Sequence, residues 1–264
     1  MNGSGKDSFW FWGGGIAVLV IVAGIALYVY QRNRGQAEVT PAAQTAAPAT
    51  PTPAPPPPAT ETPAQPARAT PLPALDQSDP EVVSGLTELL GGREPLQQFL
   101  VPQRIIRNVV VTLDNMPREK IALNQRPAKP TAGKFIVTGP EDAREIAPEN
   151  YKRYAPFVAV VKEVDAKTLA AFYRGLQPLF QQAYEELGNP SASFDARLKQ
   201  VIDHLLQTPD VTQPVKLVQP SVLYKYADPK LESLSSGQKV LIRMGPENET
   251  AVKAKLRELR AALG

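Results

Sequence analysis

Cysteine is absent from this chain of 264 residues, and histidine occurs once, as His204. Without cysteine the chain has no disulfide, no thiolate zinc site, no iron–sulfur cluster and no cysteine nucleophile. With a single histidine, one chain cannot build a multi-histidine metal site. The sequence therefore indicates no metal and no cofactor, and these absences exclude more functions than any motif suggests.

A long run without charge extends over 22 residues, from Phe9 to Tyr30. As a helix it would span roughly 33 Å, enough for a hydrocarbon core of about 30 Å. Aromatic clusters stand at both ends, where amphipathic rings favour the membrane interface. The run is too long for a secretory signal, and no small-x-small cleavage site follows it. We predict a short tail over residues 1–8 and a retained transmembrane helix over residues 9–31.

The flanking charges leave the orientation of this helix open. Lys6 precedes it, and Arg32 and Arg34 follow it, so a strict positive-inside count favours a cytoplasmic C-terminal part. Large domains, however, translocate largely regardless of such charges. Because a long tether is most useful for crossing an extracytoplasmic space, we predict a cytoplasmic N-terminus and an external C-terminal domain.

Residues 36–75 contain 12 Pro, 12 Ala and 7 Thr. Such a segment cannot bury enough apolar surface to offset chain entropy, so we predict a disordered linker. Its proline content favours polyproline II, with a maximal reach of roughly 120 Å at about 3.1 Å per residue. The block Pro55–Pro58 could dock in an aromatic-lined groove, although a solvated spacer is the simpler interpretation.

Residues 76–264 have the composition of one globular domain. They hold 25 basic and 23 acidic residues, and this near balance argues against a nucleic-acid surface. Helical spacing of apolar residues dominates, so we predict a mainly α domain (α+β with a minor β-hairpin).

Residues typical of helix starts and ends indicate where the helices of this domain lie. We expect Asp79 to cap a first helix that ends at Gly91-Gly92, and residues 105–113 to form a second helix, with a strand as the alternative. The further helices that we expect are one from Pro148 through Val161, one from Asp165 to Leu187 with a kink or break before Pro178, one capped by Ser193, and a last one that begins at Gly245-Pro246. Lys134–Thr138 could pair with Arg144–Ile146 as a hairpin, and Val215–Val218 could add a short strand.

His204 is the residue most open to a catalytic interpretation. A Ser–His–Asp site would need Asp203 to orient the imidazole and Ser191 or Ser193 within reach. Adjacent helical residues point about 100° apart, so Asp203 is poorly placed for this role. We favour a boundary histidine that bonds to a neighbouring segment.

Three other groups have a functional and a structural interpretation. Glu185-Glu186 and Glu141-Asp142 could act as catalytic pairs, but adjacent acids usually solvate helix ends or loops. Ser236–Lys239 resembles a phosphate loop without its GxxxxGK[ST] pattern. Tyr151–Tyr154, which includes Lys152 and Arg153, could form an aromatic and basic ligand patch, although core packing with hydroxyls at the rim is favoured.

Several segments together resemble a family of bacterial membrane-anchored proteins that carry a domain of unknown function. They are Asp114-Asn115-Met116-Pro117, Asn150-Tyr151-x-x-Tyr154, Val201–Leu206, Tyr224-x-x-Ala227-Asp228 and, most specifically, Leu234–Lys239 through Arg243–Asn248. The resemblance spans about residues 72–263 and includes the anchor and tether. It implies a Gram-negative envelope protein and carries over no catalytic or binding residue.

Three functional hypotheses follow. The leading one is a single-pass inner-membrane protein that presents a helical interaction domain in the periplasm to a protein partner or a cell-wall polymer. The second is an envelope enzyme acting on peptidoglycan or a related polymer, which needs polar residues such as His204 and a carboxylate in one pocket. The third is a cytoplasm-facing membrane adaptor. The sequence assigns no catalytic, cofactor-binding or metal-binding residue, and it leaves ligand and oligomeric state open.

Overall fold

The computed structural model describes residues 71–92, 94–119, 125–131, 133–211, 214–221 and 223–264. The transmembrane helix expected at 9–31, and the linker expected at 36–75 except for its last five residues, lie outside these ranges. None of the helices within the described ranges has the length and apolar character needed to span a bilayer.

Helices make up most of the described chain. They are the 3-10 turn η2 (Leu75–Gln77) and helices α2 (Asp79–Leu89), α3 (Glu94–Phe99), α4 (Ile105–Asn115), α5 (Pro148–Lys152), α6 (Ala155–Glu163), α7 (Ala166–Glu186), α8 (Phe194–Leu206), α9 (Pro229–Glu232), α10 (Ser236–Arg243) and α11 (Pro246–Leu263). Four short strands form one antiparallel sheet in the order β1-β2-β3-β4, namely β1 (Val137–Thr138), β2 (Arg144–Ile146), β3 (Lys216–Val218) and β4 (Lys225–Tyr226). The fold is thus mainly helical with a small sheet, as predicted. The expected hairpin is β1–β2, and β4 was not predicted.

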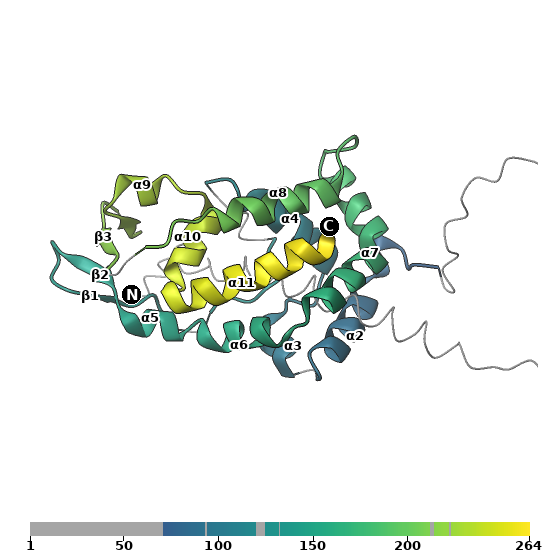
Figure 1. Ribbon diagram of the computed structural model, residues 1–264, viewed down its shortest axis with the longest axis horizontal. Helices are drawn as coiled ribbons and strands as arrows, with labels where there is room; N and C mark the ends of the chain where they lie inside the picture. The colour runs from purple at the N-terminus through teal and green to yellow at the C-terminus, as the bar shows by residue number, and fades with distance from the viewer. Residues whose placement is uncertain (1–70, 93, 120–124, 132, 212–213, 222) are drawn as a thin grey trace, which may run out of the picture.

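Helix α11 lies in the middle of the helical part (Figure 1). It packs against α6, α7, α8 and α10, while the sheet and α9 lie at one end of the domain. Its apolar stripe, Val252, Leu256 and Leu259, is buried as the spacing predicts. The helical core therefore forms around the C-terminal helix of the described chain.

Helix α10 is buried along its whole length and joins the helical core to the sheet. All eight of its residues are buried, including the polar Ser236 and Lys239. Close packing of the glycine at its second position allows this: a Cβ on Gly237 would lie 2.6 Å from Leu205 Cδ2 and 3.1 Å from the Met116 carbonyl oxygen. A larger residue there would press α10 away from the turn that follows α4.

Helix α2 begins differently from the prediction. Its N-cap is Ser78, which makes no side-chain capping bond, and Asp79 is the first helical residue. The Asp79 carboxylate instead accepts hydrogen bonds from the backbone N–H groups of Arg104 and Ile105, at 2.6 and 2.8 Å. The expected cap of α2 was therefore wrong, because this aspartate serves the start of α4.

Two other helices differ from the expected boundaries. Pro178 was expected to kink or break its helix, and α7 continues through it without a break. Buried aromatic contacts on both sides of it, such as Tyr173 with Phe180 at 5.4 Å between ring centroids, help to hold the helix together. Leu187, the expected last residue of this helix, is its C-cap and is 40% exposed. The helix expected over 148–161 is two helices, because a proline in the first turn of α6 starts a new one.

The caps expected at two helices are present. The Asp165 side chain accepts a hydrogen bond from the Thr168 N–H at 2.7 Å at the start of α7. Ser193 accepts one from the Ala196 N–H at 3.3 Å at the start of α8. The packed core also includes Leu75, which is 6% exposed and which the sequence analysis assigned to the linker.

Candidate functional site

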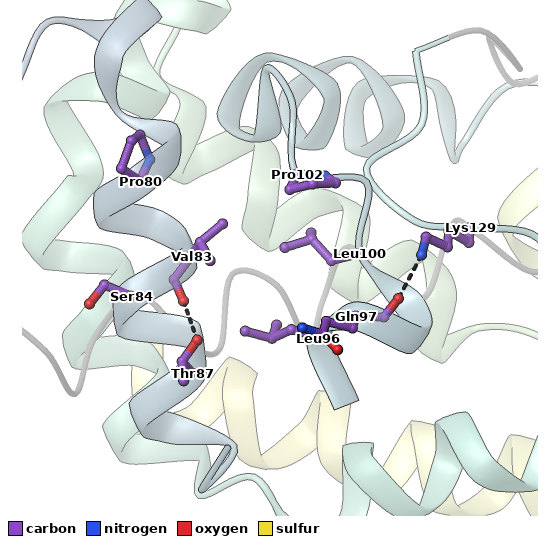
Figure 2. Close-up of a pocket in the computed structure, with 9 residues that line it drawn as sticks. All are labelled: Pro80, Val83, Ser84, Thr87, Leu96, Gln97, Leu100, Pro102 and Lys129. Atoms are coloured by element: carbon purple, nitrogen blue, oxygen red, sulfur yellow. Dashed lines mark hydrogen bonds between the residues drawn. The ribbon is translucent and has the colours of Figure 1, made fainter. Parts of the chain in front are cut away.

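A groove of about 470 Å³ lies between α2 and α3 (Figure 2). Nine residues line it: Pro80, Val83, Ser84 and Thr87 of α2, Leu96 and Gln97 of α3, and Leu100, Pro102 and Lys129. Figure 2 shows Val83, Leu96 and Leu100 pointing into the space between the two helices. The groove therefore has an aliphatic floor.

The helical spacing of α2 separates its core face from its groove face. Val82 and Leu86 are fully buried in the core. Val83 and Thr87, one position further along, are partly exposed and line the groove. Since residues four apart share a helix face, the segment that packs α2 on the core also presents one wall of the groove.

Bonds from distant segments hold both walls. The Asp79 bonds to Arg104 and Ile105 tie the start of α2 to the start of α4. On the opposite wall, the Lys129 ammonium donates to the Gln97 carbonyl at 2.6 Å, as the dashed line in Figure 2 marks. The groove is thus a fixed feature of the packed domain.

The polar groups at the rim include several hydrogen-bond donors. The Lys129 ammonium has two N–H groups besides the one bonded to the Gln97 carbonyl. Gln97 and Ser84 are exposed and carry an amide and a hydroxyl. None of the nine lining residues is Asp, Glu or His. An aliphatic floor with hydrogen-bonding groups at its rim suits the binding of a partly apolar ligand.

A second hollow of about 370 Å³ lies where α5 meets the start of α11. It is lined by Pro148, Tyr151, Lys152, Ala155 and residues 244–248. Gly245 has φ +84, and a Cβ there would lie 2.5 Å from the Tyr151 ring. The Asn248 side chain donates to the Tyr151 carbonyl at 3.0 Å. Two of the segments that carry the sequence resemblance, 150–154 and 243–248, therefore meet at this hollow.

The structure divides the aromatic and basic patch that the sequence suggested. Tyr151 and Lys152 line the second hollow. Tyr154 is buried in the core, and burial raises the pKa of its hydroxyl. The Arg153 guanidinium donates to the Thr131 hydroxyl at 3.0 Å. Core packing, the favoured interpretation, holds for Tyr154, and the half-buried Tyr151 also packs against the smaller core next to the sheet.

The single histidine contacts the start of the buried helix. His204 Nε2 lies 2.8 Å from Ser235 Oγ, and this oxygen also accepts a hydrogen bond from the Gln238 N–H as the N-cap of α10. Burial, and then the charge of Arg197, lowers the pKa of the imidazole. His204 thus bonds to a neighbouring segment, as expected, and the segment is the cap of α10.

The other residues weighed for a Ser–His–Asp site lie elsewhere. Ser193 caps the start of α8, the end opposite to the histidine, and Ser191 precedes that cap. The Asp203 carboxylate pairs with Arg260 at 3.0 Å. These three residues therefore do not assemble around the imidazole.

The paired carboxylates make structural contacts or face solvent. Glu186 pairs with Arg107, and Glu185 accepts a hydrogen bond from the Gln181 side chain at 2.9 Å. Glu141-Asp142 is exposed in the turn between β1 and β2. Across the part of the chain that the structure describes, no three His, Asp or Glu side chains gather closely enough to hold a metal ion.

The segment that resembles a phosphate loop, Ser236–Lys239, forms the first turn of α10. Its first two N–H groups donate to the carbonyls of Arg118 and Met116, at 2.7 and 2.9 Å. Its lysine pairs with Glu232 at 3.1 Å. The donors and the cation that a phosphate would need are therefore bonded within the protein.

These observations describe a mainly α-helical domain with a small antiparallel sheet and an aliphatic surface groove. The chain belongs to the family described as "Protein of unknown function (DUF3014)", whose model matches residues 105–260. The resemblance to a domain-of-unknown-function family is thereby confirmed, whereas membrane anchoring and bacterial origin stay predictions. No curated protein and no solved structure matches the chain. Of the groove residues, only Lys129 falls inside the matched range.

Sequence reasoning missed the groove because it missed α3. The signal was present: Glu94-Pro95 repeats the acidic residue and proline that open α2, and Leu96, Phe99 and Leu100 follow at helical spacing. A short helix after a double glycine is easily taken for a loop. The groove itself needs both helices placed side by side, which the sequence does not specify.

Proposed function

We propose that this chain is a membrane-tethered interaction protein, which holds its helical domain in the periplasm and binds extended, proline-containing polypeptide there. The observation that carries the proposal is the α2–α3 groove, with its aliphatic floor and donor-rich rim. The uncharged run at 9–30 and the Pro/Ala/Thr-rich segment that follows it support the tethered arrangement.

The chemistry of the groove favours this class of ligand. An extended proline-rich segment has no internal hydrogen bonds, so its carbonyl oxygens need external donors. Gln97, Ser84 and Lys129 supply an amide, a hydroxyl and an ammonium at the rim. Val83 and Leu96 offer aliphatic surface to the apolar pyrrolidine rings. A ligand rich in free N–H donors would find neutral acceptors here, the Gln97 amide oxygen and hydroxyl oxygens, but no carboxylate.

A photo-crosslinking experiment tests the binding surface. A photoreactive amino acid replaces Gln97 or Ser84 in the full-length protein, and Glu141, exposed in the β1–β2 turn, is the matched control position. A synthetic proline-rich peptide is then added, beside a Gly/Ser peptide of equal length. We expect crosslinks from the groove positions to the proline-rich peptide and none from Glu141. Equal labelling at all three positions, or by both peptides, would refute the proposed surface.

Protease shaving tests the orientation. In spheroplasts, where the inner membrane is intact, added protease should digest the domain that follows residue 71. If digestion occurs only after the inner membrane is ruptured, the periplasmic location is wrong and the cytoplasm-facing adaptor replaces it.

A further inference from the structure

We infer that the α2–α3 groove is occupied by the chain's own Pro55–Pro58 block, which folds back onto the domain that follows it. The inference rests on the proposed function in one respect, that the groove binds extended proline-rich segments. It adds the source of that segment and a regulatory consequence.

The position at which the described chain begins puts the block within reach. The first residue that the structure describes is Pro71, and the groove wall starts at Pro80, nine residues later. Twelve residues separate Pro58 from Pro71. In an extended form they reach about 37 Å at about 3.1 Å per residue. The 11 residues of α2 cover about 16 Å at about 1.5 Å per residue, so the stretch between the block and Pro71 is about twice as long as this wall of the groove.

The chemistry of the block complements the groove. Four consecutive prolines have no backbone N–H group, and their carbonyl oxygens are left as acceptors. Residues 51–60 carry no charge, which suits a floor made of Val83, Leu96 and Leu100. The rim supplies donors and lacks carboxylates, so neither partner buries a group that the other cannot satisfy. The lining has no aromatic ring, so the rings of the block pack on aliphatic side chains rather than in the aromatic-lined groove that the sequence suggested.

Because the block and the groove belong to the same chain, weak contacts are sufficient to keep the groove occupied. A short linker raises the effective concentration of the block at the groove to the millimolar range. An intrinsic dissociation constant of about 1 mM therefore already gives substantial occupancy. A partner segment must displace the block, so its apparent affinity falls in proportion to the fraction of open grooves. Release of the block also lengthens the free tether.

Because the chain has no cysteine, spin labels attach only at cysteines that are introduced, and a distance between two chosen positions can be measured. In full-length protein in detergent or nanodiscs, Ala54→Cys and Glu88→Cys are introduced together and spin-labelled, and distances are measured by pulsed electron resonance; Glu88 is an exposed residue of α2 that does not line the groove. The matched reference pair is Ala54→Cys with Glu141→Cys, because the β1–β2 turn lies at the opposite end of the domain in Figure 1. We expect one narrow short distance for the groove pair and a broad long distribution for the reference pair.

Replacing Pro55–Pro58 by serines gives the decisive variant, since it alters no residue of the packed domain. We expect the short distance to be lost. Its persistence would overturn the inference by showing that the four prolines do not hold this segment at the groove, and a broad distribution in the unsubstituted chain would overturn it outright. Dilution of the labelled protein with an excess of unlabelled protein should leave the short distance unchanged. A loss on dilution would assign the occupant to a second copy and overturn the intramolecular form.

The same variant separates this inference from the proposed function. A proline-rich peptide should crosslink more strongly to the serine variant than to the unsubstituted chain, because the groove is then open. Equal crosslinking to both would leave the proposed function standing and overturn self-occupancy. No crosslinking to either would refute the proposed groove, even if a short distance were seen.

Discussion

Replacing the buried glycine of α10 tests how closely that helix is packed. In Gly237→Ala, the new methyl group would lie 2.6 Å from Leu205 Cδ2 and 3.1 Å from the Met116 carbonyl oxygen. The leucine methyl ends a side chain that can rotate. The carbonyl belongs to the backbone and accepts the Gly237 N–H at 2.9 Å, so it can only move together with its turn.

Two opposing effects set the magnitude. Alanine in a helix interior is favoured over glycine by about 1 kcal/mol, and by less in the first turn, where Gly237 lies. Inserting a methyl group into a packed core costs about 1–3 kcal/mol. Because the contacts come from two different segments, the steric cost should exceed the helix preference. We expect a net loss of about 1–2 kcal/mol, and thus a Tm lower by about 2–8 °C for a domain of this size.

Thermal and urea unfolding of the full-length protein, followed by circular dichroism, measures this loss. Gly92→Ala is the matched control, because a Cβ at Gly92 meets nothing within 4 Å. The control should change stability by less than about 0.5 kcal/mol. A Gly237→Ala protein as stable as the control would refute the close packing of α10 against the turn after α4.

Three further predictions concern buried charge and the histidine. Burial, then Arg197, lowers the pKa of His204, so its contribution to stability is complete above about pH 6.5 and is lost as the pH falls through the folded-state pKa. The fall in Tm from about pH 7.5 to pH 5.5 should therefore be smaller in His204→Gln than in the parent, and equal falls would contradict this assignment. Lys253→Met leaves the buried carboxylate of Glu249 without its cation and should cost about 3–5 kcal/mol in urea unfolding. The double variant Lys253→Met/Glu249→Leu should recover most of the loss, and a double variant no more stable than the single one counts against this reasoning. Asp114→Asn removes the charge from a carboxylate that pairs with two arginines at 5% exposure, and calorimetry should show a loss of about 2–3 kcal/mol, whereas an unchanged Tm would argue against it.

The long helices could be predicted because their sequences carry their own signals. The stripes of α7 and α11 repeat at helical spacing, and Asp165 caps α7 as its position indicates. Asp79 has the same local signal, but its carboxylate accepts from two backbone N–H groups of another segment and so serves the start of α4. A capping residue can be recognised from sequence, whereas the helix that it serves depends on the fold.

Short elements escaped prediction because distant contacts stabilise them. Helix α10 is buried on all sides, so it lacks the alternation of apolar and polar residues that marks a surface helix. Its polar residues are satisfied by Glu232 and by the turn after α4. A contact between His204 and another segment was predicted. Its partner, Ser235, was not, since the two residues lie 31 positions apart in the sequence. The groove depends in the same way on α3, which is too short to be stable alone.

The burial of α10 sets the order in which this domain can be completed. Its first residue, Ser236, bonds to the carbonyl of Met116, which is 120 residues earlier in the chain. At a synthesis rate of about 5–20 residues per second, the turn after α4 waits about 6–24 s for this partner. A growing chain that stops between α8 and α10 should leave uncovered the apolar faces of α6, α7 and α8 that α11 later covers, open to proteases and to aggregation. Final folding is therefore a late step, which begins only when the last two helices have emerged.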